Sequence, residues 1–173
     1  KVVGPQGAVY AFEPQRALHQ ILCSNFAMNG AMHCHCKQEA LGQQPGEAVV
    51  PEMDVASEGC HGCTKLDSAN YLGETVKMTT VDALNLPKMR LLKVDVEGME
   101  LDVVRGAVKT INMFKPALYM RAHYNPADNT LSTQTQDLAR FVQVHKLPTH
   151  KRARACLHAG PYQGLARCVQ SLN

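Results

Sequence analysis

In the first part of the chain, the spacing of apolar residues is first that of a strand and then that of a helix. Residues 9–12 in "GAVYAFEPQ" form a short apolar run that predicts a buried strand, and Pro14 suits the first turn of a following helix. The apolar stripe of this helix consists of Leu18, Ile21, Leu22 and Phe26. The pair Asn29-Gly30 favours a left-handed residue and predicts where the helix ends.

The next stretch is predicted to be extended and then irregular. Residues 31–42 alternate as a strand does, and a turn at 42–46 leads to a second extended segment at 47–53. Residues 54–76 are rich in Gly, Ser, Asp, Asn and Thr without a clear period. We therefore expect a long loop there.

The second half repeats the order of strand and helix. Residues 90–96, "RLLKVDV", and 115–120, "KPALYM", predict buried strands, and a helix between them has its stripe at Val104, Ala107, Val108 and Ile111. Residues 131–145 predict another amphipathic helix and 152–157 a weak last strand, a candidate antiparallel edge. This alternation predicts an α/β fold with a mostly parallel sheet.

Composition narrows the class of protein. The chain has 173 residues, 45% hydrophobic and 19% charged, which suits one globular domain. No apolar run reaches the roughly 18 residues that a membrane span needs. The net charge is +3, and the basic residues are scattered except at 150–156, so we expect no nucleic-acid partner and favour a small polar ligand.

The cysteines allow two interpretations. The chain has seven cysteines, an odd number, and they are sparser than in a secreted disulfide-rich domain. This indicates reduced thiols and favours the cytoplasm. Cys34 and Cys36 share one strand face, and Cys60 and Cys63 form a Cys-x-x-Cys pair, so four thiolates could surround zinc. A non-catalytic zinc-binding or interaction module therefore stays open as an alternative function. Because the spacing is not that of a zinc ribbon, we expect no metal.

Carboxylates follow the predicted strands. Glu13 and Asp95 each stand at the carboxyl end of a strand, the edge where α/β folds bind ligands. A carboxylate there accepts hydrogen bonds from both ribose hydroxyls, although Glu13 could equally interact with a helix dipole. Asp95 would be desolvated unless a ligand or another group hydrogen-bonds it.

The residues after Asp95 have further candidate roles. Glu97 and Glu100 fall in the opening turn of the next helix, where negative side chains are favoured, and Gly98 is expected to allow a tight turn or close approach of a ligand. His123 follows the next strand and is a candidate general base, although a solvent-exposed loop histidine is the commoner case.

Four segments together resemble one family. They are "GPQGAVYAFEPQ", "EALGQQPGEAVVPEMD", "TTVDALNLPKMRLLKVDVEGMELDVVRGAVKTI" and "KPALYM", in that order, and the block "KVDVEGMELDVVRGA" is the most specific. The chain is similar over roughly residues 3–120 to the FkbM family of S-adenosylmethionine-dependent methyltransferases. The resemblance implies a class I methyltransferase fold, a Rossmann-like three-layer sandwich, and methylation of a hydroxyl oxygen on a small molecule or sugar.

The resemblance also implies roles for individual residues. Glu13, with Pro14 beside it, would hold the cofactor ribose, and Glu39, Ala40 and Leu41 would lie near its adenine. Asp95 would face both the methionine part of the cofactor and the acceptor. Asp95 and Glu97 would orient or deprotonate the acceptor hydroxyl, and His123, placed by its position after a strand, is a third catalytic candidate.

The chain departs from the family pattern at several places. The glycine-rich first motif and the first strand are expected before Lys1, so we expect a single truncated domain over 1–173. Where relatives have a Gly-Asn-x-Gly-Gly-like loop, this chain has "EGCHGC". Arg121 stands where an acidic residue is usual, and beyond Tyr124 the likeness fades.

Overall fold

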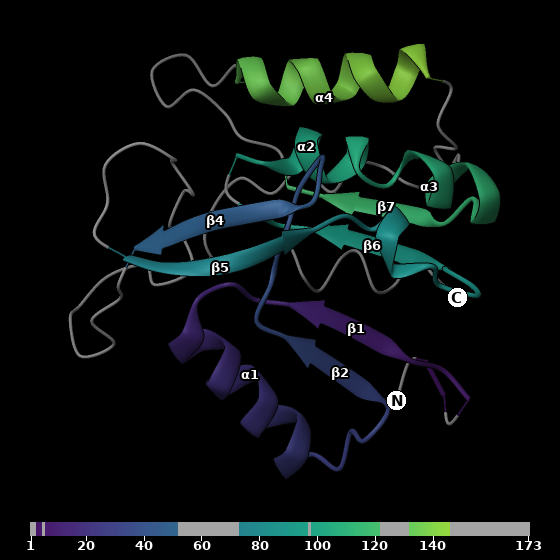
Figure 1. Ribbon diagram of the computed structural model, residues 1–173. Helices are drawn as coiled ribbons and strands as arrows, with labels where there is room; N and C mark the ends of the chain where they lie inside the picture. The colour runs from purple at the N-terminus through teal and green to yellow at the C-terminus, as the bar shows by residue number, and fades with distance from the viewer. Residues whose placement is uncertain (1–2, 5, 52–72, 97, 122–131, 146–173) are drawn as a thin grey trace. The chain divides into compact units, whose positions relative to one another are not determined.

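The computed structural model describes residues 3–4, 6–51, 73–96, 98–121 and 132–145 (Figure 1). They fall into two compact units, Lys1–Thr80 and Val81–Asn173. The expected last strand at 152–157 lies outside the described residues, as does most of the expected loop at 54–76.

The first unit begins with a strand, a helix and a parallel strand. β1 (Val9–Phe12) runs parallel to β2 (Cys34–Lys37), and α1 (Arg16–Met28) connects them (Figure 1). This confirms the predicted strand and helix at the start of the chain, but the strand is not buried as expected, since no residue of β1 or α1 is buried. Pro14 is not in the first turn, however, because the N-cap is Gln15 and the helix begins one residue later.

Two backbone hydrogen bonds, from the N–H groups of Gly30 and Ala31, close the C-terminal end of α1. The N–H of Gly30 donates to the Ala27 carbonyl at 3.0 Å, and the N–H of Ala31 donates to that of Phe26 at 2.9 Å. These are the two hydrogen bonds of a Schellman motif, which needs a left-handed residue, and Gly30 supplies it with φ +61°. The predicted helix end is therefore confirmed.

A mixed three-stranded sheet completes the first unit. In it β5 (Gly73–Thr79) lies between β3 (Ala40–Leu41), which is parallel to it, and β4 (Gly46–Pro51), which is antiparallel. Its buried core is Ala40, Val50 and Val76. The expected single strand at 31–42 is thus two strands in two sheets.

The prediction of a loop at 54–76 is wrong at its C-terminal end, because residues 73–76 begin β5. Gly73 and the exposed polar side chains of Glu74 and Thr75 give this segment a loop-like composition. Its strand form depends on pairing with β4, far away along the chain, and local composition does not report such pairing.

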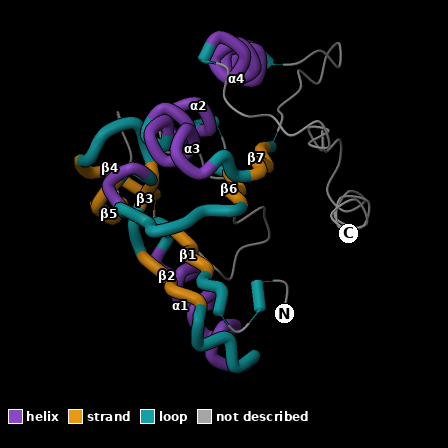
Figure 2. The backbone as a smooth tube through the Cα atoms, turned by 90° about the vertical axis from the view of Figure 1, so that its right-hand side faces the viewer, coloured by secondary structure: helices purple, strands orange, loops and turns teal. Residues whose placement is uncertain are grey.

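The second unit is built on another parallel pair. β6 (Leu91–Val94) pairs with β7 (Ala117–Met120), with Leu91 opposite Ala117 and Val94 opposite Met120. Two helices connect these strands, α2 (Glu100–Arg105) and α3 (Val108–Phe114), and Figure 2 shows both beside the pair. α4 (Thr133–Val144) packs on α2, where Arg105 lies over the ring of Phe141 at 5.6 Å.

The helix predicted between these strands is in fact two. A short 3-10 helix, η1 (Asp82–Leu84), explains the break, because Asp82 hydrogen-bonds to the chain at the junction. The backbone N–H of Asp82 donates to the carbonyl of Gly106 at 2.9 Å, and the Asp82 carboxylate accepts hydrogen bonds from the N–H groups of Lys109 and Thr110. The apolar period runs through both helices, with Val103, Val104, Ala107 and Ile111 all buried.

The described residues therefore form a mixed α/β structure. Three of the four strand pairings are parallel, and the antiparallel one is β4 with β5. They form three small sheets. Within the described part of the chain, every helix is too short or too polar to cross a bilayer.

Candidate functional site

Glu13 lies directly after β1, at the carboxyl end of the β1–β2 pair. Its backbone N–H donates to the carbonyl of Lys37 at 3.1 Å, which extends the parallel ladder by one residue. Its Oε1 accepts the backbone N–H of Gln15 at 2.9 Å, at the entrance to α1. Burial raises the pKa of Glu13 above its ordinary value of 4.5, while the hydrogen bond from Gln15 and the nearby His19 oppose this shift.

This arrangement suits a carboxylate that binds hydroxyl groups. Oε1 is held by Gln15, and Oε2 has no hydrogen-bond donor among the described residues. The side chain is half-buried, so a donor that approached Oε2 would replace water that the protein partly excludes. Pro14, also half-buried, connects this carboxylate to the N-cap of α1.

The predicted adenine segment lies in the same unit. Glu39 makes an ion pair with Lys77 at 3.5 Å, and the Glu39 side chain is the more buried of the two. Ala40 is buried in the core against Val50 and Val76, so its backbone rather than its side chain is what a ligand could contact. Leu41 is half-buried and opposite Thr79 in the parallel pairing of β3 with β5.

Asp95 follows β6 directly, and its carboxylate lies between two cations. The Nζ of Lys93 is 3.4 Å from Oδ2, and the Nη1 of Arg121 is 3.6 Å from Oδ1. Arg121 directly follows β7, and its N–H donates to the carbonyl of Val94 at 3.2 Å, which keeps the two strand ends side by side. The parallel register thus brings Asp95 and Arg121 together.

Asp95 is more accessible than its apolar neighbours suggested. Its side chain is 42% exposed, so the desolvation expected from the sequence is small. The neighbouring cations supply the polar contact for which the sequence suggested a ligand. Sequence reasoning singled out Arg121 only as a departure from the family, and the signal that it pairs with Asp95 was its position at the end of the neighbouring parallel strand.

The turn after β6 has a structural explanation. Gly98 has φ +104°, a region that side-chain-bearing residues rarely adopt, and this confirms the predicted tight turn. Its N–H donates to Oε2 of Glu100 at 3.0 Å. Glu100 is buried and forms the first residue of α2, so its carboxylate stabilises this turn. Glu97 and His123 lie outside the described residues.

No metal centre appears in the part of the chain that the structure describes. Its His, Cys, Asp and Glu side chains form no group of three or more that could hold a metal ion. Cys34 and Cys36 are free and half-buried on β2, while Cys60 and Cys63 lie outside the described residues. The zinc-binding alternative therefore has no support from the described residues.

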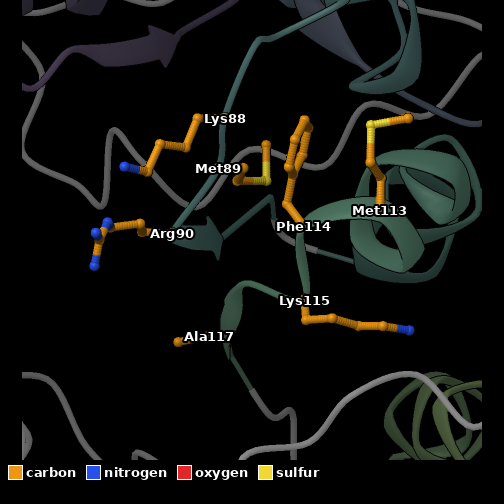
Figure 3. Close-up of a pocket in the computed structure, with 7 residues that line it drawn as sticks. All are labelled: Lys88, Met89, Arg90, Met113, Phe114, Lys115 and Ala117. Atoms are coloured by element: carbon orange, nitrogen blue, oxygen red, sulfur yellow. The ribbon is translucent and has the colours of Figure 1, made fainter.

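A basic pocket lies at the opposite end of the β6–β7 pair. It has a volume of about 460 Å³, and its lining is Lys88, Met89, Arg90, Met113, Phe114, Lys115 and Ala117 (Figure 3). The segments before β6 and β7 meet here, with the N–H of Ala117 donating to the carbonyl of Arg90 at 2.9 Å. Since these are the amino ends of the strands, the pocket is not at the edge where Asp95 lies.

The predicted site residues are therefore distributed over both units. Glu13 and the segment of Glu39, Ala40 and Leu41 belong to the first unit, and Asp95 with Arg121 belongs to the second. Each carboxylate, Glu13 and Asp95, follows a strand of a parallel pair. Such strand ends are where α/β enzymes bind cofactors and substrates.

The described residues thus form a mixed α/β structure with a carboxylate at the carboxyl end of each of two parallel strand pairs. A family model, that of the methyltransferase FkbM domain, matches residues 1–159. The chain belongs to this family, which supports a methyltransferase activity. No curated protein and no solved structure matches the chain.

Proposed function

We propose that the protein is an S-adenosylmethionine-dependent O-methyltransferase that acts on a hydroxyl of a small molecule or sugar. Family membership supports the transfer of a methyl group. The parallel strand–helix–strand units are consistent with a class I methyltransferase domain, a Rossmann-like three-layer sandwich. The cytoplasm, which the reduced thiols favour, would supply the methyl donor.

The observation that carries the cofactor assignment is the carboxylate of Glu13. One oxygen is fixed by Gln15, and the other lacks a donor among the described residues at the carboxyl end of β1. Two adjacent ribose hydroxyls supply the donors that such a carboxylate can accept. Glu39, Ala40 and Leu41 would line the adenine subsite, with backbone groups of Ala40 as the available contacts.

When bound, S-adenosylmethionine supplies an electrophilic methyl group on a sulfonium sulfur. The chain's own contribution is then to orient the acceptor and accept its proton. Asp95 is the proposed residue for this step because its carboxylate is accessible and follows a strand end. Glu97 and His123 are further candidates for the same role. Because such transfer depends mainly on in-line positioning, loss of Asp95 should slow the reaction without abolishing it.

Calorimetric titration of the protein with S-adenosylmethionine tests the cofactor assignment. Glu13→Ala should weaken binding by about 1–3 kcal/mol, because a charged hydrogen-bond acceptor is lost. Glu47→Ala is a matched control, since Glu47 is an exposed glutamate on β4 of the same unit. Equal affinities for the wild type and Glu13→Ala would remove Glu13 from the cofactor site.

A transfer assay tests the acceptor class. The protein is incubated with methyl-labelled S-adenosylmethionine and a panel of sugars, phenols and aliphatic alcohols, and label transfer is measured by mass spectrometry. We expect an ether product from at least one hydroxylated acceptor. Transfer only to amines or thiols would contradict O-methylation, and cofactor binding without any transfer would favour a non-catalytic interaction module.

A further inference from the structure

Three cysteines gather where α1 packs on β2. Cys34 and Cys36 alternate with His35 along β2, so both thiols lie on the face that α1 covers. His35 lies on the other face, where its ring stacks on Tyr10 with centroids 4.9 Å apart. Cys23 comes from the middle of α1 and is half-buried. The site proposed for methyl transfer uses none of these thiols.

Two of the thiols are in contact across this packing. Cys23 and Cys36 share a side-chain hydrogen bond, whereas Cys34 affects Cys36 only through its charge. Burial, followed by this hydrogen bond and the charges of Cys23 and Cys34, raises the pKa of Cys36 to about 11. Cys36 is therefore a protonated thiol near neutral pH and a poor first nucleophile.

Cys23 differs because a base lies next to it. The Nε2 of His19 is 3.4 Å from the sulfur of Cys23, one helical turn away on α1. A neutral imidazole at this distance can take the thiol proton. His19 in turn lies close enough to the Glu13 carboxylate for their electrostatic attraction to oppose the rise in the pKa of Glu13 that burial causes. The order of acid, histidine and cysteine is one that activates thiols.

We propose that Cys23 is a peroxide-reactive thiol whose oxidised form Cys36 resolves, closing a disulfide between α1 and β2. The proposal assigns a modification site to these residues and does not depend on methyl transfer. The oxidant is hydrogen peroxide.

The chemistry has two balanced steps. The Cys23 thiolate attacks one peroxide oxygen and the O–O bond breaks, which leaves a sulfenic acid on Cys23 and hydroxide, and the hydroxide takes the proton held by His19 and becomes water. The sulfur of Cys36 then attacks the sulfur of Cys23, and the S–O bond breaks. The hydroxyl leaves with the Cys36 proton as a second water. Two thiols lose two electrons, and one peroxide becomes two waters.

Mapping the linkage in the wild-type chain tests this proposal without any variant. The reduced protein is treated with one equivalent of hydrogen peroxide, its free thiols are alkylated, and it is digested without reduction. Trypsin leaves Cys23, Cys34 and Cys36 in one peptide, 17–37, so chymotryptic cleavage after Phe26 is needed to separate Cys23 from the other two. Fragmentation of the linked peptide in the mass spectrometer then shows whether Cys34 or Cys36 carries the alkyl group, and the other one is the linked cysteine. We expect peptides that are linked through Cys23 and Cys36. A Cys23–Cys34 linkage, or oxidation confined to other cysteines, would overturn the proposal.

Variants test the assigned roles. Cys36→Ser should leave a sulfenic acid on Cys23 that dimedone traps, and Cys34→Ser, on the same face of β2, should still form the disulfide. His19→Gln should slow the peroxide reaction of Cys23 roughly tenfold, because the thiol loses its proton acceptor. An unchanged rate in His19→Gln with native circular dichroism, or loss of the disulfide in a folded Cys34→Ser, would contradict the mechanism.

Discussion

The guanidinium of Arg121 lies 3.6 Å from the carboxylate of Asp95, across the carboxyl ends of two parallel strands. Their register sets this distance, since Val94 is opposite Met120 and each charged residue comes next in its strand. With Lys93 on its other side, Asp95 is an exposed carboxylate that two cations hold in place. The arrangement keeps this carboxylate accessible without burying an unpaired charge.

Asp95→Asn should reduce activity far more than stability. The ion pair with Arg121 is exposed, so we expect the free energy of unfolding to change by less than about 1 kcal/mol. If Asp95 takes the proton from the hydroxyl group that is methylated, the methyl-transfer rate of Asp95→Asn should fall by about 10²-fold. Urea unfolding and a label-transfer assay measure the two effects.

Asp102→Asn is the matched control for this prediction. Asp102 is also 42% exposed and pairs with an arginine, Arg105, at 3.5 Å, but it lies within α2. Its substitution should leave transfer unchanged. A similar loss of transfer in both variants would show that Asp95 acts only through the general charge of the unit.

The sequence predicted the elements whose signals are local. β1, α1, β6 and β7 each have a compact apolar run or stripe, and Gly30 marks a helix end by its own backbone preference. β5 was missed because its strand form depends on β4. The break between α2 and α3 was missed because it depends on Asp82, which belongs to an earlier segment.

The candidate site divides in the same way. Carboxylates after strands were visible in the sequence, because a strand followed by a helix places its last residue at the ligand-binding edge. The partners of those carboxylates were not. Arg121 reaches Asp95 through the β6–β7 register, and His19 reaches both Glu13 and Cys23 through the packing of α1.

Asp82→Ala should destabilise the second unit. The carboxylate accepts the N–H groups of Lys109 at 3.1 Å and Thr110 at 2.8 Å, and also the Thr110 hydroxyl at 2.7 Å. It therefore caps α3 from outside the helix, and its loss leaves donors at the helix start unsatisfied. We expect a loss of about 2 kcal/mol in the free energy of unfolding, measured by urea denaturation.

Asp137→Ala provides the comparison for Asp82→Ala. Asp137 is an exposed residue of α4 whose ion pair with Arg140 spans 3.8 Å, so its removal should change stability by less than about 0.5 kcal/mol. Equal effects of the two substitutions would mean that the cap contributes no more than a surface ion pair.

Glu13 should make stability depend on pH in the acid range. Burial raises its pKa in the folded state, so the folded protein binds this proton more tightly than the unfolded chain does. The contribution of Glu13 to the free energy of unfolding is complete below its ordinary pKa of 4.5. It is lost as the pH rises through the raised pKa of the folded protein. Glu13→Gln should remove this decline, which urea unfolding at a series of pH values measures. The same pH dependence in both proteins would show that burial at Glu13 is not its cause.

Alanine substitutions at Gly98 and Gly30 should differ in cost because their backbone conformations differ. Gly30 has φ +61°, in the left-handed region, and an added Cβ meets no atom within 4 Å, so Gly30→Ala should cost about 1 kcal/mol. Gly98 has φ +104°, outside that region, and its Cβ would come within 3.3 Å of the Gln134 side chain, so Gly98→Ala should cost about 2 kcal/mol. Thermal unfolding measures both. Gly46→Ala, where the nearest atom is at 3.8 Å, is the control and should not destabilise. If all three variants unfold at the same temperature, backbone strain does not explain why glycine is needed in the turn after β6.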